Sequence, residues 1–341
     1  MSDVLPTPAP PPAVLRWFNA HGLRKKASFA GNLARLLRHR ARARLAGRPL
    51  VAIALTEHFG DIVACEPVAR YVRQRHPQAR IVWVTRAPYR ELVAHHPSLD
   101  GCLAVFCLTE WIWLSRLGLF DTIYDLHMPD RICRYCKIPL RKPPALPVVN
   151  GRNYLRLGGL LAAFSQGAGL PALADAPRVH IPPAAAARVA RLNLPGRYAV
   201  VHGTANDYTK HWPPAKWAAL IAAMQQEQRL AVVEVGLTPF VQPAPPGLID
   251  LCGRLSLLET AEVIRRAAVF IGIDSGPAHL ANAVGTRGVL LLGAYSYFDR
   301  YNPFSGDYAA GRRCVLLQAD GPAAKLPVEA VFAAVGRVLN D

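Results

Sequence analysis

A short polar segment at 273–285, with the sequence IDSGPAHLANAVG, lies between two apolar runs and holds an acid, a hydroxyl and an imidazole. Ser275 is a good helix N-cap, Pro277 suits the first helical turn, and Gly285 suits the position just past a helix end. The segment therefore predicts a strand, a tight loop, a short helix and a second strand. A helix that starts at the carboxyl edge of a parallel sheet presents unpaired N–H groups, which commonly bind phosphate.

The same segment also has a purely structural interpretation, which the sequence leaves open. Asp274 and Ser275 would then only cap the helix, while His279 packs against a neighbouring element. Because an acid is repelled by phosphate, Asp274 is in either case expected to orient the loop or to accept its N–H groups.

A second segment, TEHFGDIVA at 56–64, also follows an apolar run. Gly60 permits a tight turn, and Asp61 opens the next helix, where a first-turn acid is common for structural reasons alone. A carboxylate that faces a cleft can instead take a proton from a hydroxyl nucleophile. We therefore expect Asp61 to be a candidate general base, with Glu57 and His58 as alternatives.

The third segment is HGTANDYTKHWPPAKW at 202–217. A turn at Gly203 and Thr204 is followed by Thr209 and Lys210, just before a predicted helix. A lysine beside a helix start can hold a phosphate, although a lone lysine is often only a surface charge.

The elements that must position these residues alternate between strand and helix, a pattern that predicts parallel, doubly wound sheets. The segment 170–197, rich in Pro and Ala, divides the alternation into two Rossmann-like halves, with substrate expected in a cleft between them. The loop at 293–306 is unusually aromatic and is expected to line a binding site. The predicted strands are 49–55, 79–85, 122–126, 198–203, 230–236, 269–273 and 288–293, and the predicted helices are 60–77, 88–97, 153–169, 214–228, 256–267 and 276–285.

The chain has 341 residues and a net charge of +17, and residues 14–48 hold ten Lys or Arg and no acid. Trp17, Phe18 and Phe29 are interleaved with these bases, a composition typical of a helix on an anionic membrane surface. A helix docked on its own domain is the alternative. Nucleic acid is not expected as a partner, because no nucleic-acid-binding motif occurs elsewhere. No apolar run is long enough to span a membrane and no secretory signal is evident, so a cytoplasmic protein is expected, peripheral on the inner membrane.

The seven cysteines are scattered, as expected for reduced thiols. Cys133 and Cys136 form the one Cys-x-x-Cys pair, within RICRYCK. A single pair is a weak metal signal, so two thiols on one helical face are expected, and whether they bind anything stays open.

Together the motifs GTANDYTKHWP, CGRLSLLETAEVI and the stretch 270–306 resemble the C-terminal half of family 9 glycosyltransferases, the heptosyltransferases of lipopolysaccharide core synthesis. The stretch 59–85 and YDLH at 124–127 resemble the N-terminal half of that family. The resemblance runs over roughly residues 50–335 and keeps the order of the motifs.

This resemblance implies a GT-B fold, in which two Rossmann-like domains face a central cleft. It implies an inverting transfer, without metal or other cofactor, from a nucleotide sugar, typically ADP-heptose, to a lipopolysaccharide-core or other cell-surface saccharide. The expected parts are a basic extension at 1–49, an acceptor-binding domain at 50–180 and a donor-binding domain at 181–341, whose last helix is expected to pack back on the acceptor-binding domain. A sugar-nucleotide epimerase of similar fold and a catalytically silent sugar-binding relative are the alternatives.

The resemblance also implies roles for individual residues. Asp61 would be the general base, and Lys210 would hold the donor phosphates. After the strand at 230–236 the family has a Gly-rich turn and a ribose-binding acid, whereas this chain has LTPFVQPAPPG, so that Glu234 is the nearest acid. The expected substrate-binding residues are Gly60, His127, Gly203, Thr204, Thr209, Glu234, Asp274, Ser275, Gly276 and His279.

Overall fold

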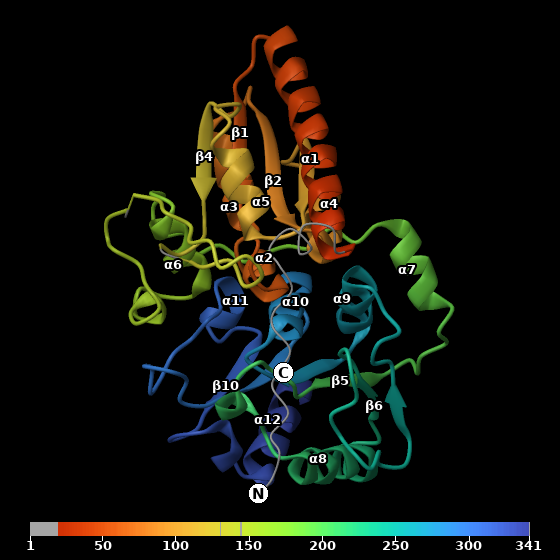
Figure 1. The fold of residues 1–341 in the computed structure, drawn as a ribbon. Helices are drawn as coiled ribbons and strands as arrows, with labels where there is room; N and C mark the ends of the chain where they lie inside the picture. Colours follow the sequence, from red (N-terminus) through yellow and green to blue (C-terminus); the bar gives the residue numbers. More distant parts are fainter. Residues whose placement is uncertain (1–19, 130, 144, 341) are drawn as a thin grey trace, which may run out of the picture.

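The computed structural model describes residues 20–129, 131–143 and 145–340, so the predictions for Trp17 and Phe18 lie outside the described residues. Two parallel sheets, each covered by helices, lie one above the other in Figure 1. This is the architecture that the alternation of strands and helices predicts. None of the described helices is both long and apolar enough to span a bilayer.

The first sheet has the strand order β3-β2-β1-β4. Strands β1 and β2 pair in register, with Ile53 opposite Trp83. The predicted helix at 60–77 is divided into two, because Pro67 starts a new helix. Strand β3 was not predicted. The elements are β1 (Leu50–Ala54), β2 (Arg80–Arg86), β3 (Gly101–Val105) and β4 (Thr122–Asp125), with helices α2 (Phe59–Ala64), α3 (Pro67–Arg75), α4 (Glu91–Ala94), α5 (Leu108–Ser115) and α6 (Leu160–Gly167).

The basic N-terminal segment forms the helix α1 (Ala20–Leu45), which packs on β3 and α5 along one side of the first sheet (Figure 1). Leu36 and Ala43 are buried against the sheet. The buried Asn32 donates hydrogen bonds to Glu110 Oε1 at 2.7 Å and to the Ala104 carbonyl at 2.9 Å. The docked helix, which was the alternative interpretation, is therefore what the structure shows for residues 20–45.

The second sheet has the order β10-β9-β8-β5-β6-β7. Strands β5 and β8 are neighbours, with Val201 opposite Ile271. Strands β7 and β10, at the two edges, were not predicted. The last helix, α12, packs on α8 and on β8, β9 and β10, so the expectation that it packs back on the first half is wrong. The elements are β5 (Tyr198–His202), β6 (Ala231–Glu234), β7 (Leu248–Asp250), β8 (Val269–Ile273), β9 (Gly288–Leu292) and β10 (Cys314–Gln318), with helices α7 (Pro183–Ala190), α8 (Pro214–Glu227), α9 (Leu257–Arg266), α10 (Gly276–Val284), α11 (Gly306–Ala309) and α12 (Val328–Asn340).

The two halves meet where α2 packs against α10, between the two sheets in Figure 1. A Cβ atom on Gly60 would lie 3.1 Å from Gly276 Cα, and a Cβ atom on Gly276 would overlap the ring of Phe59. The hydrophobic core continues across this contact, from Ile62 on α2 to Leu280 on α10. Glycine at both positions therefore brings the two polar segments of the sequence into direct contact.

Candidate active site

A cluster of Lys210, Asp274 and Tyr301 lies at the carboxyl edge of the second sheet. Lys210 ends a single 3-10 turn (Tyr208–Lys210) after β5, and Asp274 follows β8. Lys210 Nζ donates to Asp274 Oδ2 at 2.6 Å, and the Tyr301 hydroxyl donates to the same oxygen at 2.9 Å. Because β5 and β8 are adjacent parallel strands, their carboxyl ends bring together two residues 64 positions apart.

The Lys210–Asp274 pair keeps both of its charges. Burial alone would raise the pKa of Asp274, but the charge of Lys210 lowers it below its ordinary value. Burial alone would lower the pKa of Lys210, but the charge of Asp274 raises it above its ordinary value. The ammonium also lies 3.9 Å from the centre of the Tyr295 ring, in a cation–π contact. A partly buried, oriented cation therefore lies at this edge of the sheet.

The start of α10 follows the predicted pattern except at its cap. Pro277 lies in the first turn and Gly285 ends the helix with a φ of 75°, and both predictions are confirmed. Ser275 occupies the N-cap position, but its hydroxyl donates to the Ile273 carbonyl at 3.1 Å and does not cap the helix. The first turn of α10 thus lies beside the cluster without a hydroxyl cap from Ser275.

His279 lies on α10 behind Asp274 and is 3% exposed. Its Nε2 is 3.8 Å from Asp274 Oδ1, and its Nδ1 has no hydrogen-bond partner among the described residues. Burial lowers the pKa of His279, and the charge of Asp274 raises it. The effect of burial is larger, so the pKa lies below its ordinary value and the ring is neutral at pH 7. A neutral imidazole can both donate and accept one hydrogen bond toward a ligand.

Asp61 reaches the same region from the first half. It lies on α2 directly after Gly60, and its side chain is 21% exposed. Burial lowers the pKa of both Lys210 and His279. The negative charge of Asp61, like that of Asp274, acts in the opposite direction and raises both pKa values. The structure therefore places a partly exposed carboxylate of one half near the cationic cluster of the other.

The two alternative bases have other partners. Glu57 receives two hydrogen bonds from Arg131, at 2.9 and 2.7 Å. Burial alone would raise the pKa of Glu57, but these bonds and the charge of Arg131 lower it. The Asp61 carboxylate, 3.8 Å from His58 Nδ1, raises the pKa of His58. Of the two acids in this loop, Asp61 is therefore the one whose carboxylate accepts no hydrogen bond from Arg131.

His127 is fully buried beneath the loop that carries Asp61. Its Nδ1 lies 2.7 Å from Asp125 Oδ1, and its Nε2 accepts the Thr56 N–H at 2.9 Å. Both ring nitrogens of His127 therefore contact residues of the first half. His127 therefore fixes the start of the loop, and a contact with substrate stays a prediction.

Four other predicted residues contact their own loops. The Thr209 hydroxyl donates to Asp207 at 2.6 Å, the Thr204 carbonyl lies 2.9 Å from His202 Nε2, and Glu234 accepts the Phe240 N–H at 2.5 Å. A Cβ atom on Gly203 would lie 2.5 Å from the Phe240 ring. These contacts shape the loops after β5 and β6, and roles in binding substrate stay predictions for all four. The residues are Gly203, Thr204, Thr209 and Glu234.

Two tyrosines beside Lys210, and a third from the first half, were not predicted individually. Tyr295 and Tyr301 come from the aromatic loop at 293–306, which was expected to line a binding site, and both rings face Lys210 Nζ. Burial, and next the nearby Tyr295, raises the pKa of Tyr154 in the first half. The composition of the loop was a usable signal for the first two, whereas nothing near Tyr154 in the sequence marks it.

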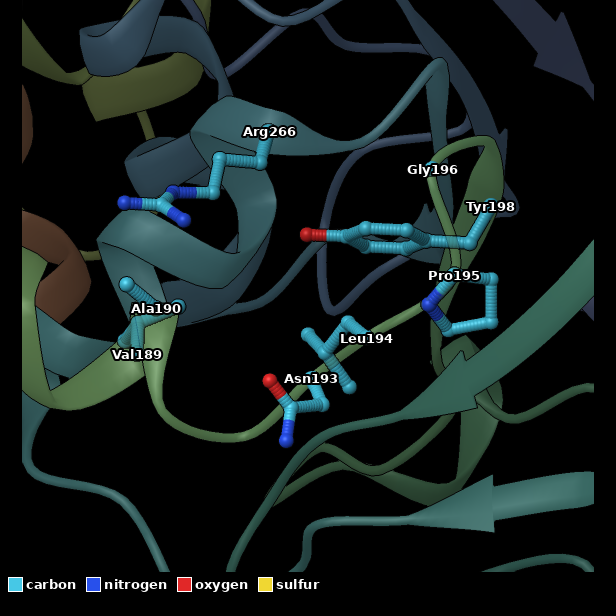
Figure 2. Close-up of a pocket in the computed structure, with 8 residues that line it drawn as sticks. All are labelled: Val189, Ala190, Asn193, Leu194, Pro195, Gly196, Tyr198 and Arg266. Atoms are coloured by element: carbon cyan, nitrogen blue, oxygen red, sulfur yellow. The ribbon is translucent and has the colours of Figure 1, made fainter.

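A separate pocket lies where α7 leads into β5 (Figure 2). None of the predicted site residues lines it, and its one charged side chain, Arg266, is paired with Glu262 at 2.6 Å. The candidate active site is therefore the Lys210–Asp274 cluster with Asp61, and not this pocket. The pocket is lined by Val189, Ala190, Asn193, Leu194, Pro195, Gly196, Tyr198 and Arg266.

Comparison with known proteins places the similarity mainly in the second half. Residues 159–309 match the family described as glycosyltransferase family 9 (heptosyltransferase). A segment of 152 residues is 32% identical to lipopolysaccharide heptosyltransferase 3 of Escherichia coli. That alignment covers 41% of this chain and 44% of the relative, so the chain matches less than half the length of this protein.

Solved structures are similar over the whole fold. A family 9 glycosyl transferase from Veillonella parvula superposes with a TM-score of 0.66 at 15% identity, over 86% of this chain and 97% of that one. The E. coli heptosyltransferase WaaC with ADP gives a TM-score of 0.58 at 17% identity, over 85% and 99%. The predicted GT-B type of fold is confirmed.

Proposed function

On the premise that this chain is a family 9, heptosyltransferase-like glycosyltransferase, we propose that it transfers a sugar from a nucleotide-sugar donor to a lipopolysaccharide-core or other cell-surface saccharide. ADP-heptose is the first candidate donor, because solved structures of the same fold include complexes with ADP and with ADP-2-deoxy-2-fluoro heptose. The transfer inverts the anomeric centre and uses no metal.

The observation that carries this proposal is the partly buried, oriented ammonium of Lys210 at the edge of the second sheet. A departing nucleoside diphosphate develops negative charge, which must be stabilised in the transition state. Lys210 donates to Asp274 Oδ2 at 2.6 Å, and Tyr301 donates to the same oxygen at 2.9 Å, so the carboxylate that orients the ammonium is itself fixed. The first turn of α10 adds N–H groups and the positive end of the helix dipole. Together they supply the positive charge that a metal provides in other transferases.

Asp61 supplies the base from the other half. Its carboxylate takes the proton of the acceptor hydroxyl while that oxygen bonds to the anomeric carbon, and the bond from this carbon to the diphosphate oxygen breaks. Inversion requires the base and the leaving group to lie on opposite faces of the sugar. Placement of Asp61 on α2, across the α2–α10 contact from Asp274, supports this division of roles.

We also propose that α1 holds the enzyme on the anionic cytoplasmic face of the inner membrane. The helix buries one face on the first sheet, and Arg35, Arg38 and Arg42 are exposed on the other. Leu37, 49% exposed, stands among them. Exposed bases with interleaved apolar side chains favour an anionic bilayer, where a lipid-linked acceptor is found.

The experiment that tests the reaction is a panel of nucleotide sugars. A donor that binds the folded state raises the unfolding temperature, so ADP-heptose and ADP should protect more than UDP-sugars. With a saccharide acceptor that lacks heptose, ADP-heptose should give net release of ADP. Conversion of a sugar nucleotide without net release would support an epimerase. Absence of protection by every nucleotide would contradict the donor site.

A further inference from the structure

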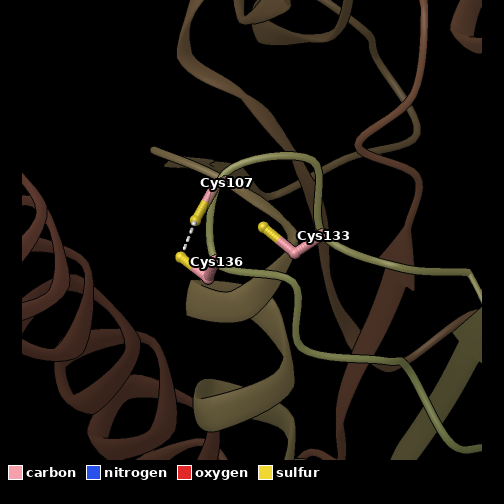
Figure 3. A group of neighbouring side chains, drawn as sticks. All are labelled: Cys107, Cys133 and Cys136. Carbon is pink, nitrogen blue, oxygen red and sulfur yellow. Dashed lines mark hydrogen bonds between the residues drawn. The ribbon is translucent and has the colours of Figure 1, made fainter. Parts of the chain in front are cut away.

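Three cysteines from two separate segments meet on the first half of the molecule, away from the candidate active site. The sulfurs of Cys107, Cys133 and Cys136 lie within 4.8 Å of one another (Figure 3). Cys107 follows β3 and is the N-cap residue of α5, and the other two lie 26 and 29 residues later. The expectation that Cys133 and Cys136 share a helical face is wrong, because they lie in a tight turn.

The turn is shaped to bring both of its sulfurs to one side. A bridge pairs Ile132 with Pro139, and the Cys133 N–H donates to the Ile138 carbonyl at 2.9 Å. The Lys137 N–H donates back to the Cys133 carbonyl at 2.9 Å, and Lys137 has a φ of 57°. A left-handed residue directly after the second cysteine reverses the chain, so that the Cys-x-x-Cys pair faces Cys107.

Sulfur spacing distinguishes a disulfide from a metal site. Cys107 Sγ and Cys136 Sγ are 3.9 Å apart, and all three cysteines are free thiols. A disulfide requires about 2.05 Å between the sulfurs. Two thiolates bound at about 2.3 Å to one tetrahedral zinc ion lie about 3.8 Å apart. The observed spacing therefore fits shared coordination of one ion.

Positive charge surrounds the sulfurs. Lys25, from α1, donates from Nζ to Cys136 Sγ at 2.8 Å. Arg134 and Lys137 flank Cys136 in the sequence. Three thiolates and Zn²⁺ carry a net charge of about −1, which one neighbouring ammonium balances. Cys107 and Cys133 are each 1% exposed, so an ion bound there would be largely screened from water.

We propose that Cys107, Cys133 and Cys136 bind one structural Zn²⁺. Soft thiolates select zinc over hard cations such as Mg²⁺ or Ca²⁺. Among the residues that the structure describes, no further Cys, His or carboxylate joins the three sulfurs. A water molecule then completes the tetrahedron.

Zinc at this position would fasten the segment after β4 to the sheet. The cluster joins the end of β3 to the 132–139 turn. The hydrogen bond from Lys25 to Cys136 also connects α1 to the cluster. Arg131, two residues before Cys133, is the partner of Glu57 in the loop that carries Asp61. The zinc site is thus a structural support for the loop of the proposed base, although its test does not depend on the proposed reaction.

The test measures zinc in the full-length protein, purified in reducing buffer without a chelator. Elemental analysis should find about one zinc per chain, falling below about 0.1 in Cys133→Ser and in Cys136→Ser. Cys102→Ser removes a half-buried thiol of β3 outside the cluster and should keep the metal. Cobalt in place of zinc should give thiolate-to-cobalt charge-transfer bands and the strong visible bands of a tetrahedral site.

The wild-type protein decides the question even if the serine variants do not fold. A chelator should lower its unfolding temperature and equimolar zinc should restore it, and Cys102→Ser should behave in the same way. Protein that contains no zinc and takes up none from an equimolar solution would overturn the proposal. So would zinc retained when Cys133 and Cys136 are both replaced, or a Cys107–Cys136 disulfide that forms in place of metal binding.

Discussion

The two halves of the molecule reach the same interface by different means. In the second half Lys210 and Asp274 follow adjacent strands, and a short ion pair joins them at the edge of a six-stranded sheet. In the first half the sheet has four strands, and among the described residues Asp61 forms no such pair with a lysine or arginine. His127 and Arg131 instead hold its loop neighbours, Thr56 and Glu57.

Similarity to known families is concentrated in the second half. The family match covers residues 159–309, which include both partners of the ion pair. In both halves the residues in contact follow neighbouring strands, β5 and β8 in the second half and β1 and β4 in the first, so separation in sequence does not distinguish the halves. The following predictions test whether the halves divide the work as proposed, with the donor bound by the second and the base supplied by the first.

The largest effect is expected for Asp61→Asn. Loss of a general base should lower turnover by about 10²- to 10⁴-fold. ADP binding measured by calorimetry should stay within about threefold, because the proposed donor contacts belong to the second half. Glu57→Gln is the matched control and should cost far less turnover. If Glu57→Gln abolishes turnover and Asp61→Asn does not, Glu57 is the base.

Next is the exposed face of α1. Replacing Arg35, Arg38 and Arg42 by Gln should weaken binding to anionic vesicles by about 100-fold, since each base near the surface contributes about 1 kcal/mol. Flotation at moderate salt measures this. Deleting the helix would remove Leu36 and Ala43 and expose the core residues on which they pack, such as Leu103 and Val105 of β3, so substitution is the cleaner experiment.

A matched control removes the same charge from the second half, at Arg191, Arg197 and Arg229, all exposed. This variant should float like the wild type. Equal losses in both variants would mean that total charge and not the α1 face governs binding, and unchanged flotation of the α1 variant would contradict the membrane proposal.

For Lys210→Ala, ADP affinity should fall by about 10- to 100-fold, because charge-assisted hydrogen bonds contribute about 1.5–3 kcal/mol. The remaining binding should depend less on salt. Lys210→Arg keeps the charge and should retain part of the affinity. An unchanged affinity together with an unchanged salt dependence would remove Lys210 from the donor site.

The contact between the halves is tested by Gly276→Ala. The added methyl group would overlap the Phe59 ring, so the free energy of unfolding should fall by about 1–3 kcal/mol. Adding Phe59→Ala should recover part of this loss. Gly151→Ala, where the added Cβ meets no atom within 4 Å, is the control. No loss in Gly276→Ala would mean that α2 and α10 separate freely.

The smallest effect concerns pH and the docking of α1. Burial, with the charge of Arg80, lowers the pKa of His39 from 6.5 to about 4. As the pH falls below 6.5 the unfolded chain takes up a proton that the folded chain does not, so the free energy of unfolding should fall between pH 6.5 and about 4. Denaturant unfolding across this range measures it. His39→Gln should flatten the slope, and an equally steep slope in that variant would assign it to other groups.

Much of the fold was predictable because its signals are local. All seven predicted strands are present, since buried parallel strands are nearly continuous apolar runs. The three strands that were not predicted, β3, β7 and β10, lie at sheet edges, and most of their residues are only partly buried. Their partial burial weakens the apolar pattern on which the prediction depends.

The sequence by itself determined the two alternating halves, the start and end of α10, and the three segments that carry Asp61, Lys210 and Asp274. Backbone preferences and hydrophobic periodicity act over a few residues, so they can be read along the chain. Tertiary structure alone decided that Lys210 pairs with Asp274, that Ser275 leaves the first turn of α10 without a hydroxyl cap, and that Cys107 joins the Cys-x-x-Cys turn. Such contacts join residues whose separation in sequence carries no information about their distance in space, and they form only when the sheets and helices have packed.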